Sequence, residues 1–289
     1  ERLTREGVRF TSAFCTTASC SASRSVILTG LYNHTNGQFG HAHLPANLHT
    51  HTWVQSLPML LKKNGYTTGV IGKLHVNPAP IYPFDYVVPG HKVGGNRSVA
   101  EIAEYAKEFF QQNIDRPFYL HVGYSDPHRS RENFGNERDY PGVEEVHYSP
   151  SDVSVPAYLP DEPEVREEWA QYYQAVSRLD QGIGMILDAL ESTGKDKDTL
   201  VIYISDNGPA FPGAKTTLYD PGIHLPMIVR SPSQDKRGTV NHAMVNWADL
   251  TPTILDWTDT PGPDYDLPGR SWLPILEEER PLGWDQIYF

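Results

Sequence analysis

The hydrophobic and polar positions along the chain follow two recurring patterns. Four segments read as short strands, and two of them contain the continuously apolar runs VIYI and PMIV, which are typical of strands buried on both faces of a sheet. They span 67–73, 116–124, 199–208 and 225–232. Four other segments have apolar residues at helical spacing, which predicts helices. They span 57–66, 98–112, 164–194 and 247–257. The chain therefore alternates between predicted strands and predicted helices.

This alternation predicts an α/β fold, with a mostly parallel sheet sandwiched by helices. In such sheets, functional side chains gather at the carboxyl ends of the strands. Three predicted strands are followed by side chains suited to binding a metal or an anion: Lys73 and His75, Asp126 and His128, and Asp206 and Asn207. We therefore expect one site at this edge of the sheet. Residues 133–164, which are rich in proline and acidic residues, are expected to form a surface excursion beside the substrate pocket.

Composition narrows the class of protein. The 289 residues are 39% hydrophobic and 21% charged, which is ordinary for a globular chain, and no linker divides it, so we expect a single domain over 1–289. The net charge of -12 argues against a nucleic-acid partner. No apolar run approaches the about 20 residues that a membrane span needs. With only two cysteines, Cys15 and Cys20, there is no disulfide framework, although a bridge between them is an alternative that would remove Cys20 from any chemistry.

Cys20 and Arg24 form the first candidate motif. The segment after Cys20 predicts the start of a helix, with Ser21 or Ser23 as a possible cap. The helix N-terminus and the nearby Arg24 both favour negative charge at the cysteine. Taken alone, the pattern is equally that of a small buried thiol beside a surface arginine.

Lys73 and His75 form a second motif and Asp126–Arg129 a third. On an extended strand end, Lys73 and His75 would point to one face, where a lysine can bind an oxyanion and a histidine can carry a proton. Pro127 fixes the backbone before His128, which is expected to meet the same anion. Taken alone, these residues are explained as well by a solvated lysine, a satisfied histidine and an ordinary loop.

Asp206 and Asn207 form the fourth motif. A carboxylate and an amide oxygen at a strand end suit a hard cation such as Ca²⁺, although Asp-Asn-Gly is also good turn chemistry. Lys215 follows after a short loop that contains glycine and proline. This loop would bring Lys215, as a second cation, back to the site of Asp206.

Together, the order and spacing of these motifs resemble the sulfatases, members of the alkaline phosphatase superfamily. The family pattern Cys-x-Pro-x-Arg, followed by a run like LLTG, stands here as CSASR at 20–24 with VILTG. The family's GK-x-H stands at 72–75 and its SDNG at 205–208. The resemblance covers nearly the whole chain. Within the family it is strongest to the heparan N-sulfatases (sulfamidases), through stretches such as YPFDY, DRPFYLHVGYSDPHR and LTPTILDW.

Two departures from the family pattern matter. Ala22 replaces the usual proline of the cysteine motif. In addition, the family's first strand ends in an Asp-Asp pair that binds the metal, and no such pair precedes Cys20; the usual small C-terminal antiparallel sheet is also missing beyond Phe289. We therefore expect a fragment whose metal site lacks two carboxylates and which has little activity. The parent gene is expected to encode the missing strand upstream of Glu1.

The resemblance implies that a formylglycine-generating enzyme oxidises Cys20 to formylglycine, the nucleophile of the family. It implies one Ca²⁺ per site, held by Asp206, Asn207, the residue derived from Cys20 and the two missing aspartates. The implied catalytic residues are Cys20, Arg24, Lys73, His75, His128 and Lys215.

Each of these residues has an implied role. Lys73 and Lys215 hold the sulfo oxygens, and Arg24 supports the formylglycine. His75 assists deprotonation of the nucleophile, and His128 donates a proton to the leaving atom.

The implied activity is release of sulfate from a sulfated sugar, with N-linked sulfate of glucosamine in heparan-type glycans as the preferred substrate. The alternatives are an O-sulfate ester sulfatase, a phosphonate or phosphate ester hydrolase of the same superfamily, and a catalytically silent relative that binds carbohydrate. The implied location is secreted, periplasmic or lysosomal, and both a monomer and a homodimer are compatible with the sequence.

Overall fold

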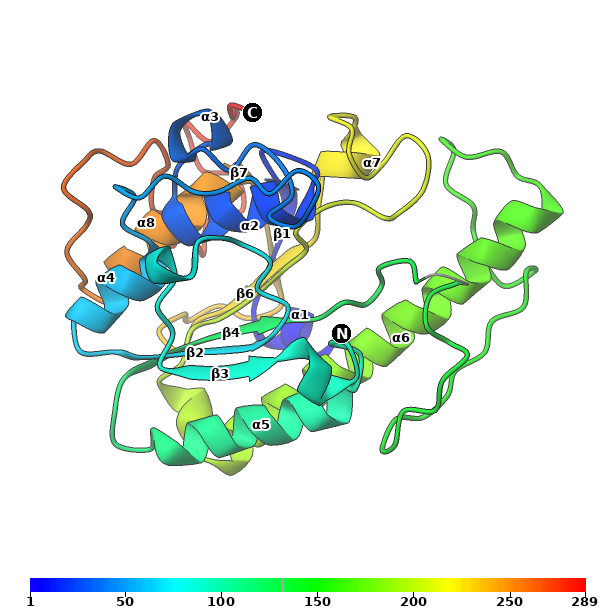
Figure 1. The fold of residues 1–289 in the computed structure, drawn as a ribbon, viewed down its shortest axis with the longest axis horizontal. Coiled ribbons are helices and arrows are strands. Elements are labelled where there is room, and N and C mark those ends of the chain that lie inside the picture. Colours follow the sequence, from blue (N-terminus) through cyan, green and yellow to red (C-terminus); the bar gives the residue numbers. More distant parts are fainter. Residues whose placement is uncertain (131–132) are drawn as a thin grey trace.

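Helices lie on both sides of a central β region (Figure 1). The computed structural model describes residues 1–130 and 133–289. One side carries α2 (Cys20–Thr29), α4 (Leu57–Lys63) and α8 (Leu250–Trp257). The other side carries α5 (Val99–Gln112) and α6 (Pro163–Ser192). The four predicted helices are all present, although the last begins as a 3₁₀ turn before α8.

The strands form two hydrogen-bonded sheets. The first has the order β5-β6-β1-β7 and the second the order β3-β2-β4. Their bounds are β1 Val8–Phe14, β2 Thr67–Gly72, β3 Tyr86–Pro89, β4 Phe118–Gly123, β5 Val201–Ile204, β6 Met227–Arg230 and β7 Thr239–Asn246. The pairs β1–β7, β2–β3 and β2–β4 are parallel, whereas β6 runs antiparallel to both β1 and β5. The predicted α/β fold class is confirmed, with an antiparallel strand inside the first sheet.

The remaining elements are short. They are α1 Arg2–Glu6, α3 Asn33–Asn36, α7 Asp220–Ile223 and the 3₁₀ turns Ala79–Ile81, Gly90–Val93, Lys195–Lys197, Trp247–Asp249 and Leu273–Ile275. Residues 133–162 form no helix or strand. Their apolar side chains, among them Phe134 and Leu159, pack with Trp169 of α6. None of the helices that the structure describes is long and apolar enough to cross a membrane.

Helix α5 packs between β2 and α6. Its buried residues Ile102, Ala106 and Phe109 recur at helical spacing and face the apolar core below the second sheet. On α6, a Cβ atom at Gly182 would lie 2.5 Å from the Cβ of Val99, so the missing side chain lets the two helices approach closely. This packing fixes the second sheet against the long helix α6.

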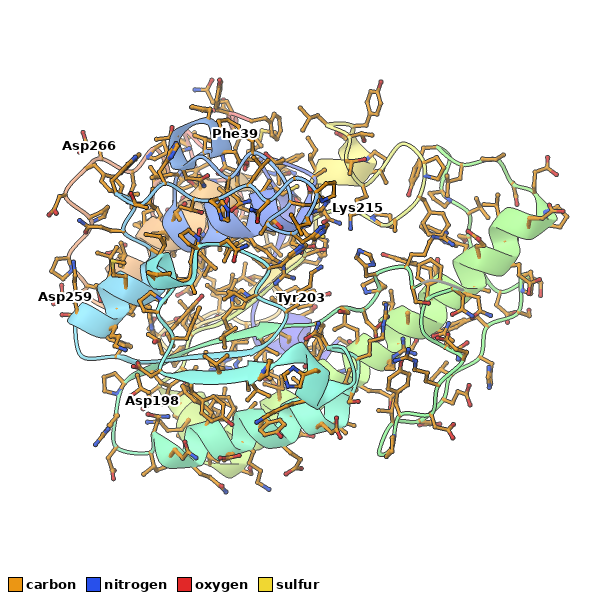
Figure 2. All side chains as sticks on the ribbon, in the orientation of Figure 1. Phe39, Asp198, Tyr203, Lys215, Asp259 and Asp266 are labelled. Atoms are coloured by element: carbon orange, nitrogen blue, oxygen red, sulfur yellow. The ribbon has the colours of Figure 1, made fainter. Side chains whose placement is uncertain are left out.

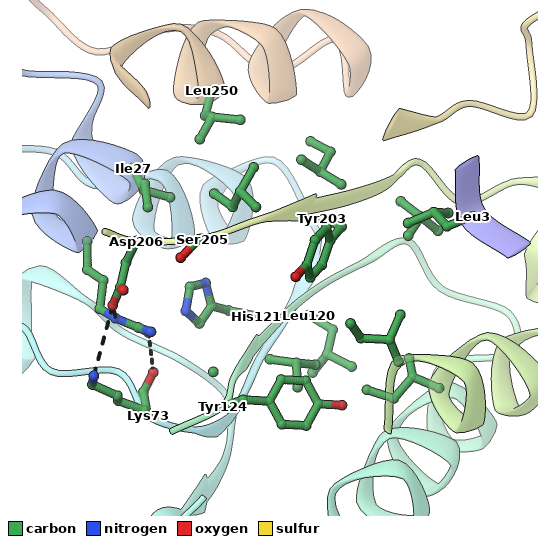
Figure 3. Close-up of a pocket in the computed structure, with 18 of the residues that line it drawn as sticks. Leu3, Ile27, Lys73, Leu120, His121, Tyr124, Tyr203, Ser205, Asp206 and Leu250 are labelled. Carbon is green, nitrogen blue, oxygen red and sulfur yellow. Dashed lines mark hydrogen bonds and ion pairs between the residues drawn. The ribbon is translucent and has the colours of Figure 1, made fainter. Parts of the chain in front are cut away.

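A cavity of about 1000 Å³ lies between the two sheets, along β4 and β5 (Figure 3). Its walls are mainly apolar and include Leu120 and Val122 of β4 and Ile202 and Ile204 of β5. β4 and β5 each stand at the edge of their own sheet, and no described strand pairs with these two edges. At one end of the cavity, charged side chains line the walls, and the candidate site lies at this end.

Candidate active site

Cys20 is the first residue of α2. Ser19 is the N-cap residue, with extended backbone angles (φ -143°, ψ 135°). The prediction of Ser21 or Ser23 as the cap was therefore wrong, because both lie inside the helix. The Oγ of Ser21 instead accepts a hydrogen bond from the backbone N–H of Ala42 at 3.1 Å. This local structure places Cys20 at the positive end of the helix dipole.

Two lysine side chains and one amide converge on the sulfur of Cys20. Lys215 Nζ lies 3.2 Å from Sγ, and Lys73 Nζ lies 3.4 Å from it. Asn207 Oδ1 lies 3.3 Å from the same atom. Cys20 itself is only 2% exposed, so these charges act where little water screens them. The position of the sulfur is thus a site that favours an anion.

The pKa of Cys20 shows the same preference. Burial acts to raise this pKa, but hydrogen bonds from His128 and His75, with the charge of Lys73, outweigh burial and lower it to about 4. By contrast, burial raises the pKa of Cys15 to about 12. Both cysteines are free, so the alternative of a bridge between them is excluded.

Arg24, Asp206 and Lys73 form an ion-pair network beside Cys20, of which Figure 3 labels Asp206 and Lys73. Arg24 Nε donates to Asp206 Oδ2 at 2.6 Å, and Arg24 Nη1 donates to the backbone oxygen of Lys73 at 2.6 Å. Lys73 Nζ lies 4.0 Å from Asp206 Oδ2. Burial acts to raise the pKa of Asp206, but Arg24 and Lys73 lower it to about 2. Asp206 is therefore ionised and shared between two cations.

Lys73 and His75 reach the site by a different backbone path from the predicted one. Strand β2 ends at Gly72 with φ 83°, and His75 has φ 60°, so the segment is not extended and that expectation was wrong. A Cβ at Gly123 would lie 2.0 Å from the backbone oxygen of Lys73. Because residue 123 has no side chain, the loop after β2 can turn over the end of β4.

Asp126 is turned away from the anion site, contrary to the prediction for this strand exit. Its side chain is fully buried and pairs with Arg97 and with Arg178, whose Nε lies 2.7 Å from Asp126 Oδ2. Two buried cations thus hold this carboxylate, which explains its inward orientation. Arg97 Nη2 also donates to the backbone oxygen of His128 at 2.7 Å. Through Arg97, Asp126 therefore positions the loop that carries His128.

His128 is available to Cys20 through one ring nitrogen. Its Nδ1 lies 2.6 Å from the backbone oxygen of Arg129, which can only accept, so Nδ1 carries a hydrogen. The interaction of His128 that lowers the pKa of Cys20 is therefore assigned to Nε2. Arg97 and Arg178, which orient this loop, were not predicted, because neither follows a strand.

Lys215 reaches the site from the loop before α7 (Figure 2). The next residue, Thr216, donates its backbone N–H to the oxygen of Ala18 at 2.8 Å, which ties the loop to the segment before Cys20. The eight residues that the family resemblance implied for the site all lie around Cys20, whereas Asp126, expected there from its strand exit, does not. They are Cys20, Arg24, Lys73, His75, His128, Asp206, Asn207 and Lys215.

Three further histidines near the site were missed. His41 and His43 lie with His75 in one group, and a His-x-His spacing was the signal that could have found them. His121 lies on β4 in the cavity, and burial, with the charge of Arg24, lowers its pKa to about 3 (Figure 3). A histidine in the middle of an apolar strand belongs to no sequence motif that would mark it as functional.

The described residues do not by themselves complete a calcium site. Ca²⁺ takes about six to eight oxygen ligands, and carboxylates set much of its affinity. Asp206 and Asn207 offer oxygens of the right kind, but the Asp206 carboxylate is engaged by Arg24 at 2.6 Å. Lys73 and Lys215 add two more positive charges close by. The donor chemistry fits, whereas the number of donors and the local charge do not.

Comparisons with known proteins place these motifs in context. A protein-family model described as "Sulfatase" matches residues 1–260. The chain is 40% identical to human N-sulphoglucosamine sulphohydrolase, in an alignment covering 100% of this chain and 62% of that protein. It is 26% identical to an ulvan-active sulfatase of Formosa agariphila, over 96% of this chain and 52% of that protein. The chain thus spans between half and two-thirds of the length of these relatives.

Solved structures share the architecture. One is a protein in complex with D-glucosamine-2-N,6-O-disulfate, described as its substrate; its TM-score is 0.75 at 21% identity, covering 100% of this chain and 78% of that one. Another is the phosphonate monoester hydrolase of Agrobacterium radiobacter, with a TM-score of 0.78 at 20% identity over 98% of this chain and 72% of that one. At these identities, the likeness shows the fold alone.

Proposed function

This chain belongs to the sulfatase family, and we propose that it carries the catalytic residues of a sulfohydrolase that releases N-linked sulfate from glucosamine in heparan-type glycans. The observation that carries the proposal is the convergence of Lys73, Lys215 and the start of α2 on Cys20 Sγ. The substrate class is supported by the 40% identity to N-sulphoglucosamine sulphohydrolase across the whole chain. Residues 1–289 are proposed to belong to one catalytic domain.

Formylglycine and Ca²⁺ are typical of the sulfatase family, and we propose that Cys20 is the residue converted to formylglycine, by a formylglycine-generating enzyme. When formed and hydrated by one water molecule, this group would supply a hydroxyl nucleophile for attack on sulfur. The geometry suits that chemistry, because the side chain of residue 20 stands at a helix start and beside two ammonium groups. Lys73 and Lys215 bind the sulfo oxygens, which carry dispersed negative charge.

Two histidines have complementary roles in this proposal. His75 takes a proton from the nucleophile, and His128, through Nε2, gives a proton to the leaving nitrogen. Arg24 holds Asp206 and the Lys73 backbone at their 2.6 Å contacts, so it keeps the ammonium of Lys73 directed at the sulfur. The reaction thus uses a fixed set of cations together with two histidines that carry protons.

Asp206 and Asn207 are the residues of this chain that would hold Ca²⁺. Further carboxylates have to reach them, and we propose that a strand ending in an Asp-Asp pair, from upstream of Glu1, brings them through the cavity between β4 and β5. The cavity's apolar walls, unpaired strand edges and cationic end support this proposal. Because the present residues do not complete the site, no catalytic step is derived through the ion.

The test is sulfate released from N-sulfoglucosamine by the protein with the upstream segment included. We expect release that is abolished in Cys20→Ala and retained in the matched control Cys15→Ala, because Cys15 is packed in the hydrophobic core and its Sγ donates to the backbone oxygen of Gly222 at 3.7 Å. Glucosamine 6-sulfate and an aryl phosphate are measured in parallel. Faster turnover of either compound would replace the proposed substrate with an O-sulfate or a phosphate ester, and unchanged sulfate release in Cys20→Ala would refute the nucleophile.

The 289-residue chain alone is the second arm of this experiment. It is expected to bind Ca²⁺ poorly and to release little sulfate, because two of the expected carboxylates are missing while three cations face the site. Restoring the upstream segment should recover metal binding and activity together. Full activity of the bare 289-residue chain would show that the metal site is misassigned.

A further inference from the structure

His41, His43 and His75 form a compact group beside the candidate active site. One ring nitrogen from each lies within 4.8 Å of those of the other two. The ring centroids are 4.8, 5.1 and 5.6 Å apart, with interplanar angles of 14°, 9° and 19°. Three ring nitrogens are thus gathered in one small volume, with the ring planes nearly parallel.

The backbone holds the group together from two sides. Ala42, between His41 and His43, donates its N–H to Ser21 Oγ at 3.1 Å and accepts from Asn77 Nδ2 at 2.9 Å. Ser21 follows Cys20 on α2, and Asn77 belongs to the loop that carries His75. The His41–His43 segment is therefore tied to both of the elements that build the anion site.

The hydrogen bonds of the three rings leave a nitrogen free on each. His43 Nδ1 lies 2.9 Å from the backbone oxygen of Leu44, so Nδ1 carries the hydrogen and Nε2 keeps its lone pair. The Nδ1 atoms of His41 and His75 are buried and have no hydrogen-bond partner among the described residues. An unpartnered buried nitrogen is costly, and two of them in one group indicate a missing ligand.

His75 is held in a sparsely populated backbone conformation, with φ 60°. A residue other than glycine rarely adopts this backbone conformation unless surrounding contacts impose it. His75 acts to lower the pKa of Cys20, and because its buried Nδ1 has no hydrogen-bond partner among the described residues, we assign this interaction to Nε2. Nδ1 is thus the atom left for a ligand shared with the other two histidines.

We propose that His41, His43 and His75 form a second metal site, distinct from the calcium site, which binds one divalent transition-metal ion such as Zn²⁺. Three neutral imidazoles suit Zn²⁺, Cu²⁺ or Ni²⁺ and exclude Ca²⁺, which requires oxygen ligands. The nitrogens, which all lie within 4.8 Å of one another, would come to about 3.3 Å apart in a tetrahedral zinc site. The exposed His43 ring, on its loop, provides that movement.

Occupation of this site has a consequence for catalysis that rests on the proposed function. An ion on Nδ1 of His75 uses that lone pair, so the ring proton is confined to Nε2. His75 can then donate to residue 20 but can no longer accept its proton. The second site therefore switches off the proton acceptor without touching the anion-binding lysines.

The binding test uses the untagged 289-residue chain, titrated with Zn²⁺ by calorimetry and with Co²⁺ by visible absorption. We expect one ion per chain, with affinity lowered by about tenfold or more in His41→Ala, His43→Ala and His75→Ala. His49→Ala is the matched control, because His49 is exposed on the same loop and outside the group. Circular dichroism checks folding, and the exposed His43 keeps the test valid if His41→Ala does not fold.

Two results would overturn the proposal: no binding of Zn²⁺ by the unaltered chain, or equal affinity in His43→Ala and His49→Ala. The consequence for His75 is tested on the active protein, where Zn²⁺ should inhibit sulfate release and His43→Ala should relieve inhibition by about tenfold. Inhibition that His43→Ala does not change would refute the switch. Because zinc binding is measured without substrate, it stands or falls independently of the proposed activity.

Discussion

Replacing Asp126 with asparagine removes the carboxylate that two buried guanidinium groups share. Arg97 comes from the segment before α5 and Arg178 from α6, and their side chains are 9% and 6% exposed, while the Asp126 side chain is fully buried. Asparagine keeps the volume of the side chain but not its charge. In Asp126→Asn, two cations therefore stay in a poorly solvated place without their counter-charge.

The expected cost follows from this burial. Removing one partner of a buried ion pair costs about 3–5 kcal/mol of unfolding free energy, because the remaining charge is left uncompensated. The matched control is Asp161→Asn. Asp161 also pairs with an arginine, Arg166 at 2.5 Å, but its side chain is 57% exposed. A solvated pair of that kind contributes little to the free energy of unfolding.

The assay is urea unfolding followed by circular dichroism, with the two variants compared by their midpoints. Asp126→Asn should also accelerate amide hydrogen exchange around His128, because Arg97 then holds the oxygen of His128 less firmly at its 2.7 Å contact. Equal midpoints for Asp126→Asn and Asp161→Asn would refute the assignment of Asp126 as the anchor of this loop.

Three further predictions concern the anion site. In the chain with unmodified Cys20, the ultraviolet absorbance of its thiolate should persist at neutral pH and disappear only as the pH falls through about 4, since the folded-state pKa lies below the usual value of a thiol; titration near pH 9 would contradict this. Gly123→Ala should destabilise the chain and displace Lys73, because the new Cβ would lie 2.0 Å from the Lys73 oxygen, whereas Gly184→Ala, with nothing within 4 Å, should be neutral or stabilising in the same urea assay. Lys215→Ala should weaken binding of sulfate, measured by calorimetry, and an unchanged affinity would remove Lys215 from the anion site.

Much of the architecture could be predicted from hydrophobic periodicity alone. The four predicted helices and the four predicted strands are present, because each has an apolar pattern that is clear in the sequence. β1, β3 and β7 were missed. β1 reads VRFTSAF and β7 reads TVNHAMVN, so polar side chains interrupt the apolar pattern that identified the others. The antiparallel direction of β6 was also not readable, because strand direction depends on tertiary pairing.

The candidate site was predictable for residues that occur in ordered motifs and not for those that act through tertiary contacts. Lys215 was expected near Cys20 from its place after the SDNG turn, and its Nζ lies 3.2 Å from the sulfur. Asp126 carried the same signal as Asp206, a carboxylate after a strand. Only the positions of Arg97 and Arg178, distant in sequence, decide that Asp126 faces inward.

Arg24 links the two sheets to each other at the candidate site. Its guanidinium is bound to Asp206, which follows β5 in the first sheet, and to the oxygen of Lys73, which follows β2 in the second. The Arg24 side chain thus connects the two sheets, which have the cavity between them. Any sliding of one sheet against the other changes the spacing between Lys73 and Cys20 directly. Variants that loosen the packing of α5 on α6, far from the sulfur, should therefore disturb anion binding before they unfold the chain.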